Sequence, residues 1–315
     1  MTWPETHLEV EERQLRDLVG AVCADIRSED PATLSTARSA LVNAGIWSLD
    51  LIEGDGLLPL VLATLTMAET SPALAWSFVQ AIASTVLFES AGGAEYILEG
   101  GTAVVVSGDV PGSGDSFIAR IIPSQTGCAV AILPREGFGP GTVVYPNDIK
   151  IVSRGPITGL DGLESVTLTI TAAHTVGNEE VASRARRVAH VGTIAIAAGL
   201  SLAAAGLAEN WVREREQFGA PLIAIGSVAG RVADLRGRAN GLLRSARALA
   251  TDAEAPLDHQ VIADCEQAIG TAEAAVQLHG GYGYMRENTV EHLLRDAVSL
   301  RAAAWAICAP KLVGA

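Results

Sequence analysis

The stretch IGSVAGRVADLRGRANGLLRSARAL, residues 225–249, carries the most regular apolar pattern in the chain. Its apolar residues alternate spacings of three and four, which brings them to one face of a helix. Most of the arginines in the stretch fall off that stripe. The pattern predicts a long amphipathic helix with one buried face. The residues of the stripe are Ile225, Val228, Val232, Leu235, Ala239, Leu242, Ala246 and Leu249.

Helical patterns fill the whole chain from about residue 178 onward. A short link, EAPLD at residues 254–258, is followed by a second apolar stripe that begins at Val261 and reaches Val276. Long amphipathic helices with short links between them are typical of antiparallel bundles. The sequence therefore predicts a C-terminal four-helix bundle over residues 176–315.

The segment VGTIAIAAGLSLAAAGLA, residues 191–208, contains no charged residue. Its length is near the lower limit for a membrane span. However, most of its positions are Ala, Gly, Ser or Thr, and the helical pattern continues into the charged ENWVREREQFG. We expect a buried helix in a tight bundle, and no membrane association.

The rest of the chain divides into a helical and a β region. Residues 1–98 read as helices with short breaks, whereas residues 99–175 hold short β-branched runs such as TAVVVSG and SVTLTITA. Turn residues separate these runs, which predicts a small antiparallel β domain. The glycines of GDVPGSGD lack the βαβ context of a phosphate cradle, so we expect a loop there. The predicted fold class is α+β, with domains over 1–98, 99–175 and 176–315.

Composition narrows the class of protein. The chain has 315 residues and a formal net charge of −14, which argues against nucleic acid or an anionic membrane as the main partner. The N-terminus, MTWPETHLEVEERQ, lacks the basic and apolar regions of a secretory signal. The four cysteines are far apart in apolar contexts, which indicates free thiols in a reducing cytoplasm and no metal site.

Two long segments resemble motifs of the acyl-CoA dehydrogenase family. They are REREQFGAPLIAIGSVAGRVADL, residues 213–235, and QLHGGYGYMRENTVEHLLRDA, residues 277–297. The early stretch LVNAGIWSLDLIEGDG resembles the N-terminal helix and turn of the family, so the resemblance covers nearly the whole chain. It implies an FAD enzyme that desaturates an acyl thioester between its α and β carbons.

The resemblance also implies a cofactor site shared between subunits. In this family the two motifs reach across an interface to the pyrophosphate and adenine side of a neighbour's FAD. An arginine fork suits phosphate oxygens, a phenyl ring suits the adenine face, and paired glycines let backbone N–H groups approach. Taken singly, the same residues also suit helix ends or a core anchor. The implied cofactor-binding residues are Arg215, Gln217, Phe218, Gln277, Gly280 and Gly281.

The chain departs from the family where the catalytic base belongs. A carboxylate must take the α proton while FAD takes the hydride. By motif position, the Glu of most members falls at Ala304 and that of other members at Ala189. His190 is the remaining candidate proton acceptor, and it replaces an arginine typical of the family. We therefore assign no catalytic residue to this chain.

Other features of the family are also reduced. The β region lacks the Thr-Glu-Pro and Trp-Ile-Thr/Ser stretches that flank the flavin ring. We expect Arg295 and Asp296 to form a structural ion pair, and Tyr282 and Tyr284 to serve packing rather than chemistry. The half of the site that holds the flavin ring is lost, whereas the half donated to a neighbour is kept.

This asymmetry resembles the shortened subunit of actinobacterial α2β2 acyl-CoA dehydrogenases of steroid and cholesterol breakdown. The resemblance implies a homologous full-length partner that carries the base, an acyl-CoA substrate and an electron-transfer flavoprotein as acceptor. Two alternatives stay open: a self-sufficient acyl-thioester dehydrogenase of secondary metabolism that uses His190 or water as base, and a flavin-free scaffold subunit.

Overall fold

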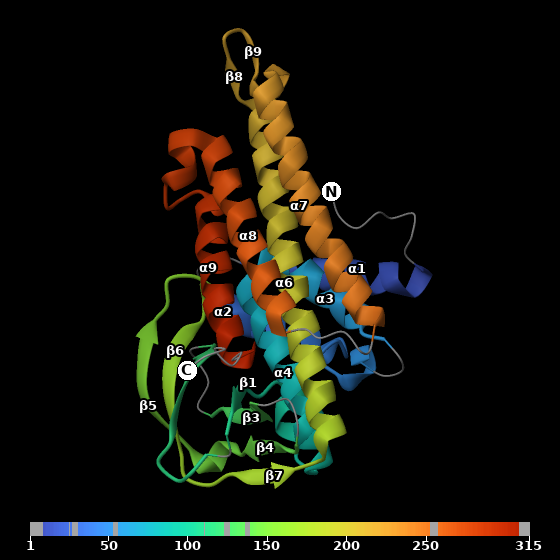
Figure 1. Ribbon diagram of the computed structural model, residues 1–315, viewed down its shortest axis with the longest axis vertical. Coiled ribbons are helices and arrows are strands. Elements are labelled where there is room, and N and C mark those ends of the chain that lie inside the picture. Colours follow the sequence, from blue (N-terminus) through green and yellow to red (C-terminus); the bar gives the residue numbers. More distant parts are fainter. Residues whose placement is uncertain are drawn as a thin grey trace.

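The computed structural model describes residues 9–24, 26, 31–52, 56–109, 111–122, 127–135, 139–252 and 258–308. The first eight residues, where we sought a secretory signal, lie outside this part of the chain, as do residues 254–257 of the predicted EAPLD link and Val110 of the GDVPGSGD loop. In Figure 1 the described chain forms a long helical bundle, with the β strands at one end and a small hairpin at the other.

Helices form the N-terminal region, as the sequence predicts. Proline lies in the first turn of α3, as Pro59, and of α4, as Pro72, where its fixed φ suits the helix. The Ser71 side chain caps α4 by accepting a hydrogen bond from Leu74 N at 3.2 Å. Nearly every residue of α4 is buried. The elements are α1 (Val10–Cys23), α2 (Pro31–Asn43), η2 (Leu49–Ile52), α3 (Leu58–Thr70), α4 (Pro72–Ser90) and α5 (Glu95–Leu98).

The β region consists of two small sheets that face each other across an apolar layer. One sheet has the order β1-β3-β4-β7 and the other β2-β6-β5. The strands are β1 (Ala103–Gly108), β2 (Ser116–Ile121), β3 (Ala129–Pro134), β4 (Gly141–Val144), β5 (Ile149–Pro156), β6 (Glu164–Ile170) and β7 (His174–Val176), with the turn η3 (Pro146–Asp148) before β5.

The β region is antiparallel, as predicted, with the exception of one strand pair. β1 and β3 run parallel, with Val104 opposite Val130, whereas the other strand pairs of both sheets are antiparallel. The reason is that the chain leaves the first sheet after β1 to form β2 in the second. It then returns beside β1 in the same direction, which a hairpin cannot do.

Four long helices build the C-terminal bundle. Asn178 caps the first by accepting a hydrogen bond from Val181 N at 3.0 Å. In Figure 1 the β8–β9 hairpin projects beyond the bundle at the end far from the sheets. The elements are α6 (Glu179–Glu214), β8 (Glu216–Gln217), β9 (Ala220–Pro221), η4 (Leu222–Ala224), α7 (Gly226–Thr251), α8 (Asp258–His279), η5 (Gly280–Tyr284) and α9 (Thr289–Cys308).

The helix α6 is the central element of the fold. It has 36 residues and contacts α3, α4, α7, α8 and α9. Glycines allow this crowding, since a Cβ at Gly192 would lie 2.6 Å from the side chain of Val79. Within the described chain, α4 and α6 are long and apolar enough to cross a membrane, and 83% of the apolar window of each is buried inside the protein. The prediction of a buried helix over residues 191–208 is confirmed.

Candidate functional site

A pocket of about 420 Å³ opens at the end of the bundle far from the sheets. The C-terminal end of α6, the strand β8, the end of α8 and the turn η5 all contribute to it. The pocket brings together five of the six residues predicted to bind a cofactor. These are Arg215, Gln217, Gln277, Gly280 and Gly281.

Arg215 marks the point where α6 ends. Its N–H donates to Trp211 O at 2.8 Å, while its carbonyl accepts from Leu222 N at 2.8 Å and closes the base of the hairpin. Among the described residues the Arg215 side chain makes no ion pair, and it is exposed. A guanidinium left in this way is available to an anion from outside the chain.

Phe218 is the predicted residue that the structure keeps out of the pocket. It lies at the tip of the β8–β9 hairpin, 95% exposed, so the alternative of a core anchor is wrong. Its φ is +56°, followed by Gly219 at +81°. A positive φ costs a residue with a Cβ about 1–2 kcal/mol. An aromatic side chain held out in a strained turn is poised for contact with another molecule.

The second wall of the pocket is formed by the end of α8 and the turn η5. Gly280 opens this turn with φ +61°. A Cβ built at Gly280 or Gly281 would meet no atom within 4 Å, so these positions face open space rather than a packed neighbour. Gln277 accepts a hydrogen bond from Tyr284 Oη at 3.3 Å. Tyr282 and Tyr284 are 54% and 66% exposed, and the packing expected of them is seen for Tyr282, whose ring lies against Trp211.

Sequence reasoning missed the aromatic residues that line the same pocket. The indole of Trp211 stacks on His279 at 5.2 Å between ring centroids, with 21° between planes, and Tyr282 leans against the indole at 5.5 Å. Burial lowers the pKa of His279, while its bond to Ala275 O acts the other way. The position of Trp211, one helical turn before Arg215, was the available signal.

The chemistry of the pocket fits one half of FAD. An exposed guanidinium, a side-chain amide and two glycines without Cβ atoms offer donors to a pyrophosphate, and an aromatic wall offers a flat face to a nucleobase. A volume of about 420 Å³ lies within the range of small-molecule sites.

The positions where the family keeps its base lie far from this pocket and are closed. Ala189 and Ala304 are fully buried in one hydrophobic core. His190 is 1% exposed, and burial, together with the charge of Arg186, lowers its pKa to about 3. Its Nε2 lies 3.7 Å from Cys308 Sγ and its Nδ1 3.6 Å from Asp258 Oδ1. The ring is therefore a weak base without access to substrate.

Polar contacts near His190 join the β region to the bundle. Arg186 of α6 donates to Pro134 O, and at 3.4 Å to Ser107 Oγ. Ser107 in turn donates to Ile307 O of α9. These contacts tie β1 and β3 to the two bundle helices α6 and α9.

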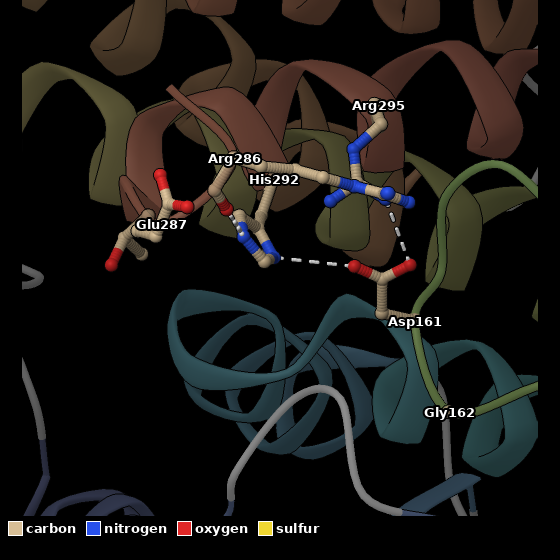
Figure 2. Close-up of a pocket in the computed structure, with 7 residues that line it drawn as sticks. Asp161, Gly162, Arg286, Glu287, His292 and Arg295 are labelled. Atoms are coloured by element: carbon tan, nitrogen blue, oxygen red, sulfur yellow. Dashed lines mark hydrogen bonds and ion pairs between the residues drawn. The ribbon is translucent and has the colours of Figure 1, made fainter. Parts of the chain in front are cut away.

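A larger pocket of about 650 Å³ lies between the β5–β6 loop and the start of α9 (Figure 2). Here Arg295 pairs with Asp161 Oδ1 at 3.0 Å and with Glu291 at 3.0 Å. Asp296 is buried and accepts from Leu160 N at 2.5 Å. The predicted Arg295–Asp296 ion pair is therefore wrong, because the two side chains leave the helix in different directions toward different partners on the loop.

Comparison with known proteins finds similarity to acyl-CoA dehydrogenases. Residues 180–304 match the family model described as acyl-CoA dehydrogenase, C-terminal domain. An acyl-CoA dehydrogenase of Bacillus subtilis is 30% identical over 222 residues, a match that covers 64% of this chain and 55% of the relative. The chain thus matches little more than half the length of that relative.

Solved structures show the fold along the whole chain. The ChsE4–ChsE5 complex from Mycobacterium tuberculosis superposes with a TM-score of 0.69 and 19% identity, over 97% of this chain and 96% of that one. A variant of the Tcur3481–Tcur3483 steroid ACAD gives 0.69 and 18% identity, over 95% of both chains. The fold is that of an acyl-CoA dehydrogenase.

Proposed function

We propose that this chain is the base-lacking subunit of a heteromeric FAD-dependent enzyme. The premise is that the chain is acyl-CoA dehydrogenase-like in its fold and in its matched bundle. In this proposal a homologous full-length subunit holds the flavin ring and the catalytic carboxylate, and the two subunits form an α2β2 assembly. This chain completes the FAD site across the interface, with Arg215, Gln217, Phe218, Gln277 and Gly280–Gly281.

One observation carries the proposal. The pocket that suits the nucleotide half of FAD is open, with a free arginine, whereas the junction where the base belongs is filled by Ala189, Ala304 and a buried His190. A subunit that provides only the nucleotide half of an FAD site can function when another chain provides the flavin-ring half. FAD, when bound, supplies the hydride acceptor; this chain's residues bind and orient its other end.

The descriptions of two similar structures support a proposal for the substrate and the partners. One of them is described as a steroid ACAD and another as a two-protein complex. We infer a bulky acyl-CoA, such as one derived from a steroid or from cholesterol, as substrate. We also infer an electron-transfer flavoprotein as acceptor, a cytoplasmic location and the domain division at residues 98 and 175.

Coexpression with the full-length homologue tests the proposal. We expect a yellow complex with one FAD per heterodimer, and a colourless, inactive chain when it is purified alone. Flavin absorbance and the mass of the complex give both results. A homotetramer of this chain alone with full FAD occupancy and turnover of acyl-CoA would overturn the proposal and favour a self-sufficient enzyme.

Substitutions then test the residues. Arg215→Ala and Gln277→Ala are each expected to weaken FAD retention in the complex on the order of tenfold or more, because each removes a donor to the cofactor. Arg244→Ala, at an arginine on α7 that is also exposed, is the matched control. If the Arg215 and Gln277 variants retain FAD as the control does, the pocket does not hold FAD and a flavin-free scaffold becomes the better explanation.

A further inference from the structure

The turn that carries the cofactor-facing glycines is linked to the β region by one histidine. His292 lies on α9 and is 9% exposed. Its Nδ1 lies 3.2 Å from Asp161 Oδ2, and its Nε2 lies 2.5 Å from the carbonyl oxygen of Arg286 (Figure 2). The ring therefore bridges the β5–β6 loop and the segment that joins η5 to α9.

The loop end of this bridge is firmly fixed. Gly159 touches the backbone of α9 so closely that a Cβ there would lie 2.1 Å from Arg295 O. Leu160 is fully buried at φ +56°, and its N–H donates to Asp296 Oδ1. Arg295 holds Asp161 at 3.0 Å and donates to Thr158 O at 2.8 Å. Asp161 therefore presents its carboxylate to His292 from a rigid platform.

The other end of the bridge leads to the pocket. Arg286 sits in a turn whose neighbours bond back to η5: Met285 N donates to Tyr282 O at 3.1 Å, and Asn288 Nδ2 donates to the same oxygen at 3.2 Å. The Tyr282 ring in turn leans on Trp211, which lines the pocket. A displacement of the Arg286 carbonyl thus moves the group of residues that shapes the cofactor site.

We propose that His292 is a positioning residue: by bridging Asp161 and the Arg286 carbonyl, it fixes the Gly280–Tyr284 turn in the orientation that receives the cofactor. This inference rests on the proposed function of the pocket. It adds a specific coupling, because the β region of this chain then influences a cofactor whose reactive ring lies in the partner. His292 itself lies outside the cofactor pocket and acts through the turn.

The link is tested first without cofactor, on the full chain labelled with 5-fluorotryptophan. Trp211→Phe identifies the fluorine resonance of Trp211 by its loss. We expect His292→Ala to shift or broaden the Trp211 resonance and to leave those of Trp47 and Trp76 in place, since these two lie in the N-terminal core. His174→Ala is the matched control. His174 Nε2 lies 3.6 Å from Asp148 Oδ2, a similar pair that is not part of the Gly280–Tyr284 turn.

The effect on the cofactor is tested next, on the apo complex with the full-length homologue. FAD titration should give a Kd on the order of tenfold higher for His292→Ala and for Asp161→Ala, since each breaks the same link between the loop and the turn. The double variant should be no worse than either single one, because the two residues act in series. Asp161→Asn, which keeps an oxygen acceptor, should restore most of the affinity.

The outcomes separate the two proposals. If His292→Ala leaves the Trp211 resonance and the Kd for FAD unchanged while Arg215→Ala raises that Kd, the positioning role is overturned and the proposed function stands. If all tryptophan resonances collapse together, His292 supports the fold in general and the positioning role is overturned as well. If Arg215→Ala leaves FAD binding intact, the proposed function fails, and the Trp211 resonance still reports whether the mechanical link exists.

Discussion

The pKa of Asp296 depends on the contact between the β region and the bundle. It is 3% exposed, at the place where the β5–β6 loop crosses α9. Burial, helped by the charge of Asp161, raises the pKa of Asp296 from its ordinary 3.8 to about 7. The hydrogen bonds from the loop backbone act in the opposite sense without reversing the shift. A carboxyl group in such a place prefers to be neutral.

This raised pKa predicts a pH dependence of stability. Between about pH 4 and pH 7 the unfolded chain releases the Asp296 proton and the folded chain keeps it, so the free energy of unfolding falls as pH rises, by about 4 kcal/mol in total. Asp296→Asn cannot ionise and lacks this slope. Urea unfolding at a series of pH values should show that the free energy of unfolding of the variant increases relative to that of the native chain as pH rises. Parallel curves for the two proteins would contradict the assignment.

Two glycines of α6 allow a prediction at the scale of the element. A Cβ at Gly199 would lie 2.6 Å from Leu65 O and 2.8 Å from Ala68 Cβ, whereas one at Gly206 would meet nothing within 4 Å. Gly199→Ala should therefore destabilise the chain by about 1–3 kcal/mol. Gly206→Ala should stabilise it by up to about 1 kcal/mol, because alanine is the better helix former. Thermal unfolding of both variants is the measurement, and equal effects would mean that α6 does not pack as described.

The β8–β9 hairpin gives a prediction in which stability and function diverge. Phe218→Asn replaces the strained residue with one that tolerates positive φ, so the isolated chain should unfold at an equal or slightly higher temperature. The same change removes an exposed aromatic ring, so FAD retention in the complex should fall. Calorimetry of the chain and flavin content of the complex measure the two effects. A loss of stability together with unchanged FAD content would show that Phe218 serves this chain alone.

Across the whole molecule, the sequence predicts what depends on local periodicity. The helical bundle, its buried apolar helix and the change to strands near residue 100 all follow from spacing and composition. The parallel pairing of β1 and β3 does not, because it depends on how the chain passes between two sheets. The contacts of Arg295 with Asp161 and of Asp296 with Leu160 were missed for the same reason, since Asp161 and Leu160 lie more than a hundred residues away on a loop.

The candidate site was predictable only in part. The two motifs identified Arg215, Gln277 and the glycines, and the fold brings these to one pocket. Trp211 and His279 were missed because their stacking joins the ends of two helices that the sequence does not place side by side. Phe218 lies outside the pocket, at the tip of the hairpin, where nothing within the described part of its own chain covers it.

The length of α6 sets a distance that the cofactor must respect. Ala189 lies near its first turns and Arg215 directly follows its end, so 26 residues of helix separate the two positions. At a rise of 1.5 Å per residue, that helix holds them roughly 40 Å apart. An extended dinucleotide is shorter than this span, and a continuous helix does not fold back on itself. Within one chain, the predicted base position at Ala189 and the pocket at Arg215 are therefore too far apart to contact the same cofactor. If the pocket binds FAD as proposed, the flavin ring of that FAD lies at another subunit's junction, and the proposed site is complete only in the assembly.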